Sequence, residues 1–185
     1  KAKVPDDGVE YVSKKRNIDV DNITKLGFSI VEPETRQLKV IHASHKDQAQ
    51  IKDMIIRKTT GGGTITRQSR KGRKMSGFYT FPKSQPAMND KQTIERAHKY
   101  VTDLATKKPN IGIENSYVHS FDIDPSANFA KYEGSFGMTR ISPQKFEEYY
   151  NAGIDVIISK ADAEELVIIN PEILVNHKII NKLKL

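Results

Sequence analysis

The sequence contains no cysteine, and this absence excludes several kinds of site at once. Without thiols there can be no disulfide scaffold, no thiolate zinc site and no cysteine nucleophile. The lack of cysteine suits a protein that works in a reducing cytosol or that crosses membranes unfolded. Long apolar runs are missing too. We therefore expect no membrane-spanning helix, no signal-like segment at the start and no membrane partner.

Three sequence signatures of catalytic or metal sites are also missing. Gly61–Gly63 form a glycine run, but no Gly-Lys-Ser/Thr closes it, which argues against a phosphate-binding P-loop. No Gly-x-Ser-x-Gly elbow is present, so an acyl-transfer triad is not indicated. The five histidines are scattered, and the closest pair is His42 and His45. We therefore expect no metal site.

What remains is a polar, basic chain of 185 residues, of which 37% are hydrophobic and 29% charged. This length suffices for one domain with its own core. The net charge of +7 permits an acidic partner, such as nucleic acid or a phosphate-bearing cofactor. The chain starts at Lys1 rather than Met, so we expect a fragment of a longer protein. Residues 1–26 are interpreted as a leader or linker, and 27–185 as a single domain.

Short apolar runs and unevenly spaced helical patterns predict an α+β fold. Ser142 and Pro143 are a typical helix start, and Gly153 a typical left-handed end. Residues 127–138 are interpreted as a loop, and 172–185 as either a helix or a strand. Strands are expected near residues 28–31, 38–41, 77–81, 117–123, 155–159 and 166–170, with helices near 45–58, 90–104 and 142–152.

The segment Ser76–Val101 is expected to organise the chain. Its short aromatic run delivers Tyr79 to a strand end, and an apolar stripe through Ala97 predicts a helix packed directly behind that strand. A phenol in this place can stack on a flat ligand, or it can be a half-buried core aromatic.

The other candidate residues can each have a purely structural role instead of a functional one. The loop Gly61–Lys74, which carries Arg67 and Arg70, is expected to be flexible and either to clamp phosphates or to be a solvated surface loop. His42, predicted at the turn after a strand, can be a structural histidine. The pair Glu164–Glu165 can be a solvated turn before a late strand.

Three motifs nevertheless resemble ADP-ribosyltransferases of the His–Tyr–Glu type. Val40–Ser44, read Val-Ile-His-Ala-Ser, is similar to the family's strand-end His-Gly-Ser/Thr element. Gly77–Thr80, with Ala97 and Tyr100 on the next helix, resembles its tyrosine strand. Glu165–Pro171 resembles the late strand that begins with a glutamate and closes in Asn-Pro. The resemblance covers roughly His42 to Pro171 and is strongest to C-terminal domains of bacterial secreted toxins.

The resemblance implies a split core of two small, roughly perpendicular antiparallel sheets with a cleft and flanking helices. It also implies NAD as the cofactor, cleaved at the nicotinamide–ribose bond through an oxocarbenium-like transition state. Glu165 would stabilise that positive charge, with Glu164 as the alternative. His42 would hydrogen-bond the ribose, and Tyr79 would stack on the nicotinamide.

By the same resemblance, further residues would contact the cofactor. Ala43 and Ser44 follow His42, and Tyr100 would form a second aromatic wall. Arg67 and Arg70 would meet the pyrophosphate or an acidic target. Ala43 stands where the family prefers glycine, but alanine can still offer its backbone N–H and C=O.

The expected acceptor of ADP-ribose is a macromolecule, either protein or nucleic acid. Ala163 occupies the place of the first glutamate in relatives that modify arginine, so arginine is not indicated as the acceptor. The protein would be a toxic effector, secreted and active in the cytosol of a target cell, with a cognate immunity protein as a possible partner. The alternative is a nucleic-acid-binding or RNA-cleaving toxin module that does not use NAD.

Overall fold

The computed structural model describes residues 2–3, 10–11, 15–32, 38–44, 66–68, 74–76, 78–79, 90–107, 112, 114, 116–134, 141–159 and 165–182. For the short strands before residue 15 and between 66 and 79, only the backbone is described. The helix predicted near residues 45–58 lies outside these ranges.

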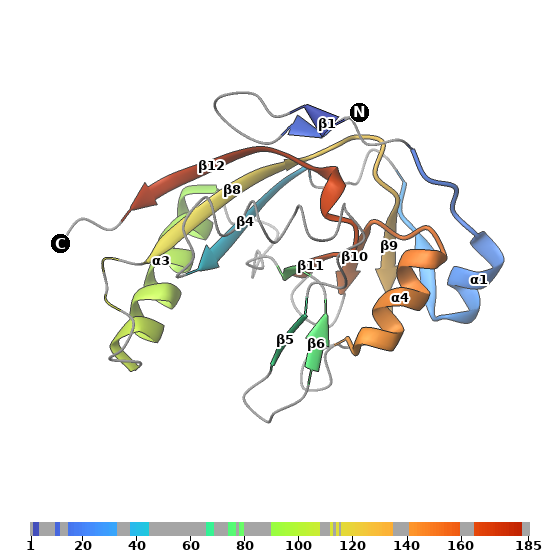
Figure 1. The fold of residues 1–185 in the computed structure, drawn as a ribbon, viewed down its shortest axis with the longest axis horizontal. Coiled ribbons are helices and arrows are strands. Elements are labelled where there is room, and N and C mark those ends of the chain that lie inside the picture. Colours follow the sequence, from blue (N-terminus) through green and yellow to red (C-terminus); the bar gives the residue numbers. More distant parts are fainter. Residues whose placement is uncertain are drawn as a thin grey trace.

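Two sheets dominate the described part of the chain, which confirms the α+β class. The five-stranded sheet has the order β3 (Phe28–Ile30), β9 (Phe129–Tyr132), β10 (Val156–Ser159), β11 (Glu165–Ile168) and β7 (Phe78–Tyr79). The three-stranded sheet has the order β12 (Leu174–Lys182), β8 (Tyr117–Ile123) and β4 (Lys39–Ser44), and these strands run side by side in Figure 1. Two hairpins complete the strands: β1 (Ala2–Lys3) with β2 (Glu10–Tyr11), and β5 (Thr66–Gln68) with β6 (Lys74–Ser76).

The prediction of two antiparallel sheets is correct for the three-stranded sheet but wrong for one pair in the larger sheet. There β9 and β10 are parallel, with Phe129 opposite Val156. The reason is the helix α4 (Pro143–Asn151), which lies between them in the sequence and returns the chain as a β-α-β crossover. The strand β9 falls within the predicted loop 127–138, because its residues Phe-Ala-Lys-Tyr form neither an unbroken apolar run nor an alternation of apolar and polar residues.

An apolar cluster joins the two sheets across the core between them. Val40 and Phe121 of the three-stranded sheet pack in one cluster with Phe129, Leu166 and Ile168 of the five-stranded sheet. The facing sheets thus share one interior, and each turns its other face to helices.

Helices α1 (Val20–Lys25) and α4 cover the outer face of the five-stranded sheet, where Ile23 and Phe146 pack with Ile157 and Val167. The start of α4 is confirmed, because the Ser142 side chain accepts a hydrogen bond from the Lys145 N–H at 3.2 Å. No helix within the described ranges combines the length and apolarity needed to cross a membrane.

Helix α3 (Asp90–Lys107) confirms the predicted apolar stripe but not its predicted place. Ala97 packs with Ile41 of β4 and Val118 of β8, so α3 covers the outer face of the three-stranded sheet. The expectation that it lies directly behind the strand of Tyr79 is therefore wrong. The small side chain of Ala97 suits a close approach to the β-branched and apolar residues of that sheet.

Both ends of the chain contribute to these layers. Residues 15–26, interpreted as part of a leader, include the fully buried Ile23 and a backbone bond from the Asp19 N–H to the Ala152 carbonyl at 3.0 Å. They are thus integral to the packed domain. The undecided segment near the C-terminus forms a short 3₁₀ turn, Pro171–Ile173, and then β12.

Candidate functional site

His42 lies within β4 rather than at a turn after it. Its backbone is paired with that of His119, and the pairing continues to Ser44 opposite Tyr117. The predicted turn at His42 is therefore wrong, because β8 continues as a pairing partner beyond it. Alternation from Val40, which is in the core between the sheets, places His42 on the face turned to the five-stranded sheet. Ala43 lies on the opposite face, packed against the cluster of α3.

Tyr79 and Glu165 come from distant parts of the sequence to neighbouring strands. Strand β7 pairs with β11, with Tyr79 opposite Val167. Glu165 is the first residue of β11, two positions before Val167, and is half-buried opposite the fully buried Ser159. The structure thus brings together two of the three residues predicted to act in catalysis.

Strand alternation decides which face of the sheet Glu165 belongs to. Leu166 and Ile168 enter the core between the sheets, whereas Val167 enters the core beneath α4. With a period of two, Glu165 belongs to the face of Val167, not to the face turned toward His42. Glu164 precedes this strand and lies outside the described residues. Which of Glu164 and Glu165 could act in catalysis therefore has to be tested by substituting each of them.

The other predicted cofactor contacts are dispersed. Ser44 ends β4 and is half-buried, and Tyr100 on α3 is 51% exposed, away from the buried stripe of that helix. Arg67 lies in β5, whereas Arg70 is outside the described residues. Part of the predicted flexible loop Gly61–Lys74 is thus extended backbone, because β5 pairs with β6 in a hairpin.

Sequence analysis did not connect His119 and His177, which meet in the structure. His119 Nδ1 lies 2.9 Å from His177 Nε2, and the two rings are 0% and 2% exposed. His177 also stacks on Phe121, with the ring centroids 4.4 Å apart and an interplanar angle of 9°. The His42 ring lies on the other side, its centroid 6.2 Å from that of His119. The alternation of Tyr117, His119 and Phe121 along the sequence could have indicated that the His119 ring is buried. No periodic pattern indicates that the His177 ring is buried as well.

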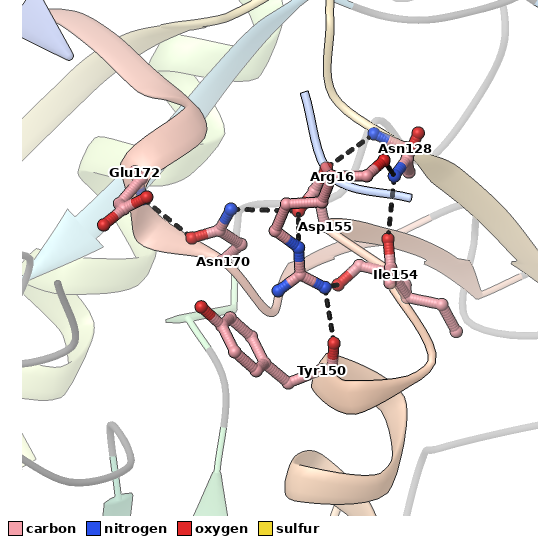
Figure 2. Close-up of polar contacts among 8 residues, drawn as sticks. Arg16, Asn128, Tyr150, Ile154, Asp155, Asn170 and Glu172 are labelled. Carbon is pink, nitrogen blue, oxygen red and sulfur yellow. Dashed lines mark hydrogen bonds and ion pairs between the residues drawn. The ribbon is translucent and has the colours of Figure 1, made fainter. Parts of the chain in front are cut away.

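A buried carboxylate links the segment before α1 to the five-stranded sheet (Figure 2). Asp155 is 2% exposed and accepts hydrogen bonds from the Asn128 N–H at 2.7 Å and the Asn170 side-chain amide at 2.9 Å. Arg16 Nε lies 3.2 Å from the same carboxylate, and its guanidinium stacks over Tyr150.

Burial raises the pKa of Asp155, and the Asn128 N–H, the Arg16 charge and the Asn170 amide offset part of this rise. Because these donors already bind the carboxylate, we interpret Asp155 as structural rather than catalytic.

A pocket of about 450 Å³ opens beside this network. None of the predicted site residues lines it; its wall consists of Lys15, Arg16, Asn17, Ile18, Ile30, Asn128 and Phe129. Within the described part of the chain, no group of three or more histidine, cysteine or acidic side chains is placed to hold a metal ion.

Comparison with protein-family models, with curated proteins and with solved structures gives no match. The function therefore has to be argued from the residues of this chain.

Proposed function

We propose that this chain is an NAD-dependent ADP-ribosyltransferase that uses Glu165, Tyr79 and His42. The observation that supports this proposal is the pairing of β7 with β11, which brings Tyr79 beside the strand that Glu165 begins. His42 lies on the other sheet and faces this one, whereas strand alternation assigns Glu165 to the face of Val167; the role of His42 is therefore supported by the resemblance of its motif alone. An aromatic ring and a carboxylate from neighbouring strands can hold nicotinamide and the adjoining ribose together.

The proposed reaction breaks the bond between the nicotinamide nitrogen and the ribose carbon. Nicotinamide leaves with the bonding electron pair, and the ribose carbon gains positive character. A fixed carboxylate stabilises that charge in the transition state more than in the ground state. A nucleophilic group of the macromolecular acceptor then forms the new bond and loses its proton. In this proposal the protein is the toxic part of a larger secreted protein, acts in the cytosol of a target cell and has a cognate immunity protein as a partner.

The deciding experiment compares Glu165→Gln with Glu164→Gln. Labelled NAD is incubated with cell lysate, and we measure nicotinamide release together with transfer of label to protein and to nucleic acid. Glu165→Gln keeps the size of the side chain but removes its charge. We expect it to cost about 3–4 kcal/mol of transition-state stabilisation, a several-hundred-fold loss of rate. Glu148→Gln is the control, because Glu148 is exposed on α4 and its substitution should leave turnover unchanged.

Two results would contradict parts of this proposal. If Glu164→Gln abolishes turnover while Glu165→Gln retains it, the catalytic carboxylate is Glu164. If the wild-type protein consumes no NAD with any acceptor, the proposed enzyme activity is refuted.

A second candidate function is nucleic-acid binding, and the β5–β6 hairpin favours it. This hairpin projects from the rest of the fold in Figure 1 and carries Arg67 and Lys74 in its strands. The net charge of +7 adds a general attraction for phosphates. RNA binding that weakens steeply with salt, without NAD binding by calorimetry, would support this function over the first. Neutralising Arg67, Arg70 and Arg73 together should then lower the salt dependence.

A further inference from the structure

A β-bulge in β12 aims His177 into the protein. Val175 pairs with Asp122 and Lys178 with Ser120, so Asn176 and His177 together oppose the single residue Phe121. Asn176 has φ 52°, in the left-handed region, where asparagine is among the better-tolerated residues. Its side-chain amide donates to Asp122 Oδ2 at 3.0 Å, which holds the bulge in place.

The bulge changes which residues of β12 face the interior. Leu174 is buried in the core between the sheets. Uninterrupted alternation from Leu174 would turn Asn176 inward and His177 outward. Instead Asn176 and Lys178 are exposed and His177 is buried. The extra residue therefore serves to place an imidazole inside, and bulges commonly re-aim a side chain in this way.

The buried bond between the two imidazoles limits how many protons they can hold. At 2.9 Å, one of His119 Nδ1 and His177 Nε2 must donate and the other must accept. This requirement is met when both rings are neutral or when they share one extra proton. A second extra proton would make both facing nitrogens donors and would bring two positive rings together away from solvent, where their charges are poorly solvated.

The surroundings of the pair add further titratable groups. His42 on β4 and Tyr117 on β8 each have ring centroids 6.2 Å from that of His119. Asp122 holds the bulge, and Lys178 is exposed on β12. Residues 10–11 of β2, glutamate and tyrosine, pack near β12, with side chains outside the described residues. Across the shared core, the five-stranded sheet contributes apolar side chains such as Phe129 and Leu166. Lys131 of β9 lies on the same face as Phe129 by strand alternation and adds a charged group there.

We propose that the His119–His177 pair is an acid-sensitive clasp between β8 and β12. The clasp is closed while the two rings hold at most one extra proton between them, and it opens when both rings become protonated. When the clasp opens, β12 separates from β8, and His119 loses its contact with the His177 ring. Because His119 lies opposite His42, acid would alter the face that carries His42. The clasp does not depend on the proposed enzyme activity.

The sign of the pH effect follows from counting protons. In the unfolded chain each histidine takes up a proton near pH 6.5. The folded pair takes up one fewer, so stability falls as the pH drops below that value. A deficit of one proton changes the folding equilibrium constant by up to about tenfold per pH unit.

The experiment measures hydrogen exchange of the β12 amides and the folding equilibrium between pH 7.5 and 5. In the wild-type protein we expect β12 to lose protection first as the pH falls. His177→Gln can still bond His119 but takes up no proton, so its profile should be nearly flat. His98→Gln is the matched control. Burial lowers the pKa of His98, which lies on α3 outside the pair, so this variant should keep most of the acid sensitivity.

The proposal is overturned if His177→Gln and His98→Gln lose acid sensitivity to the same extent. It is also overturned if neither variant loses acid sensitivity. If His177→Gln does not fold, the wild-type protein still decides the matter through the imidazole ¹⁵N shifts. One proton taken up by the pair before β12 opens supports the clasp. Full protonation of both rings while β12 remains protected overturns it.

Discussion

The buried carboxylate of Asp155 is bound by residues from several parts of the chain, among them Arg16. Asp155 is reached by an arginine from before α1, a backbone N–H at the start of β9 and an amide from after β11. Four parts of the chain are thereby fixed to one another. Removing one partner of such a buried pair costs more than the pair itself contributes, because the remaining charge stays desolvated.

Arg16→Met should therefore destabilise the protein by about 3–5 kcal/mol at pH 7. The Arg16 charge lowers the pKa of Asp155, so its loss raises that pKa further. A carboxyl whose folded pKa is raised contributes stability at low pH and loses it as the pH rises through that pKa. The deficit of the variant should thus be smaller at pH 4 than at pH 7, as measured by urea unfolding at both values. Lys15→Met, at an exposed neighbouring position, is the control. A deficit that does not change with pH would contradict the role assigned to the Arg16 charge.

At the scale of elements, tight turns fix how helices and strands meet. Gly27 follows α1 with φ 90°, and Gly153 follows α4 with φ 91°. Both need the left-handed region, but their surroundings differ. A Cβ at Gly153 would lie 2.1 Å from the Asn17 carbonyl oxygen, whereas one at Gly27 would meet only the Tyr132 ring at 3.5 Å.

These two glycines provide a matched pair of variants. Gly27→Ala should cost about 1–2 kcal/mol, the penalty for a left-handed alanine. Gly153→Ala should cost clearly more, because it also pushes the Asn17 backbone away from the end of α4. Thermal unfolding of both variants measures the difference. Equal losses would show that the approach of Asn17 contributes nothing to stability.

At the scale of the whole molecule, the described elements form four layers. Helices α1 and α4 cover the five-stranded sheet, the three-stranded sheet follows, and α3 closes the other side. The segment before β3 contributes α1 to the first layer, where Ile23 packs with Phe28 and Phe146. It is therefore part of the fold.

Ile23→Ala should destabilise the protein by about 2–5 kcal/mol, as expected for a large-to-small change in a packed core. Val20→Ala, on the same helix, should stay within about 0.5 kcal/mol because Val20 is 50% exposed. Chemical denaturation of both variants tests this. Similar small losses would show that α1 is only loosely attached.

Local elements whose signals are complete within a few residues could be predicted without the structure. The cap at Ser142, the left-handed Gly153, the stripe of α3 and the alternation of Tyr117–Ile123 each follow from short-range geometry and were predicted correctly. The adjoining strands β10 and β11 were predicted for the same reason.

Which elements face each other could not be predicted, because it depends on long-range contacts. The parallel β9–β10 pair, the docking of α3 on β4 and the pairing of Tyr79 with Val167 join residues far apart in the sequence. Burial then decided what polar residues do: Asp155 became a structural anchor, and a bulge at Asn176 turned His177 toward His119. Such long-range contacts depend on the shape and desolvation of the assembled layers, and a periodic pattern along one strand carries no information about them.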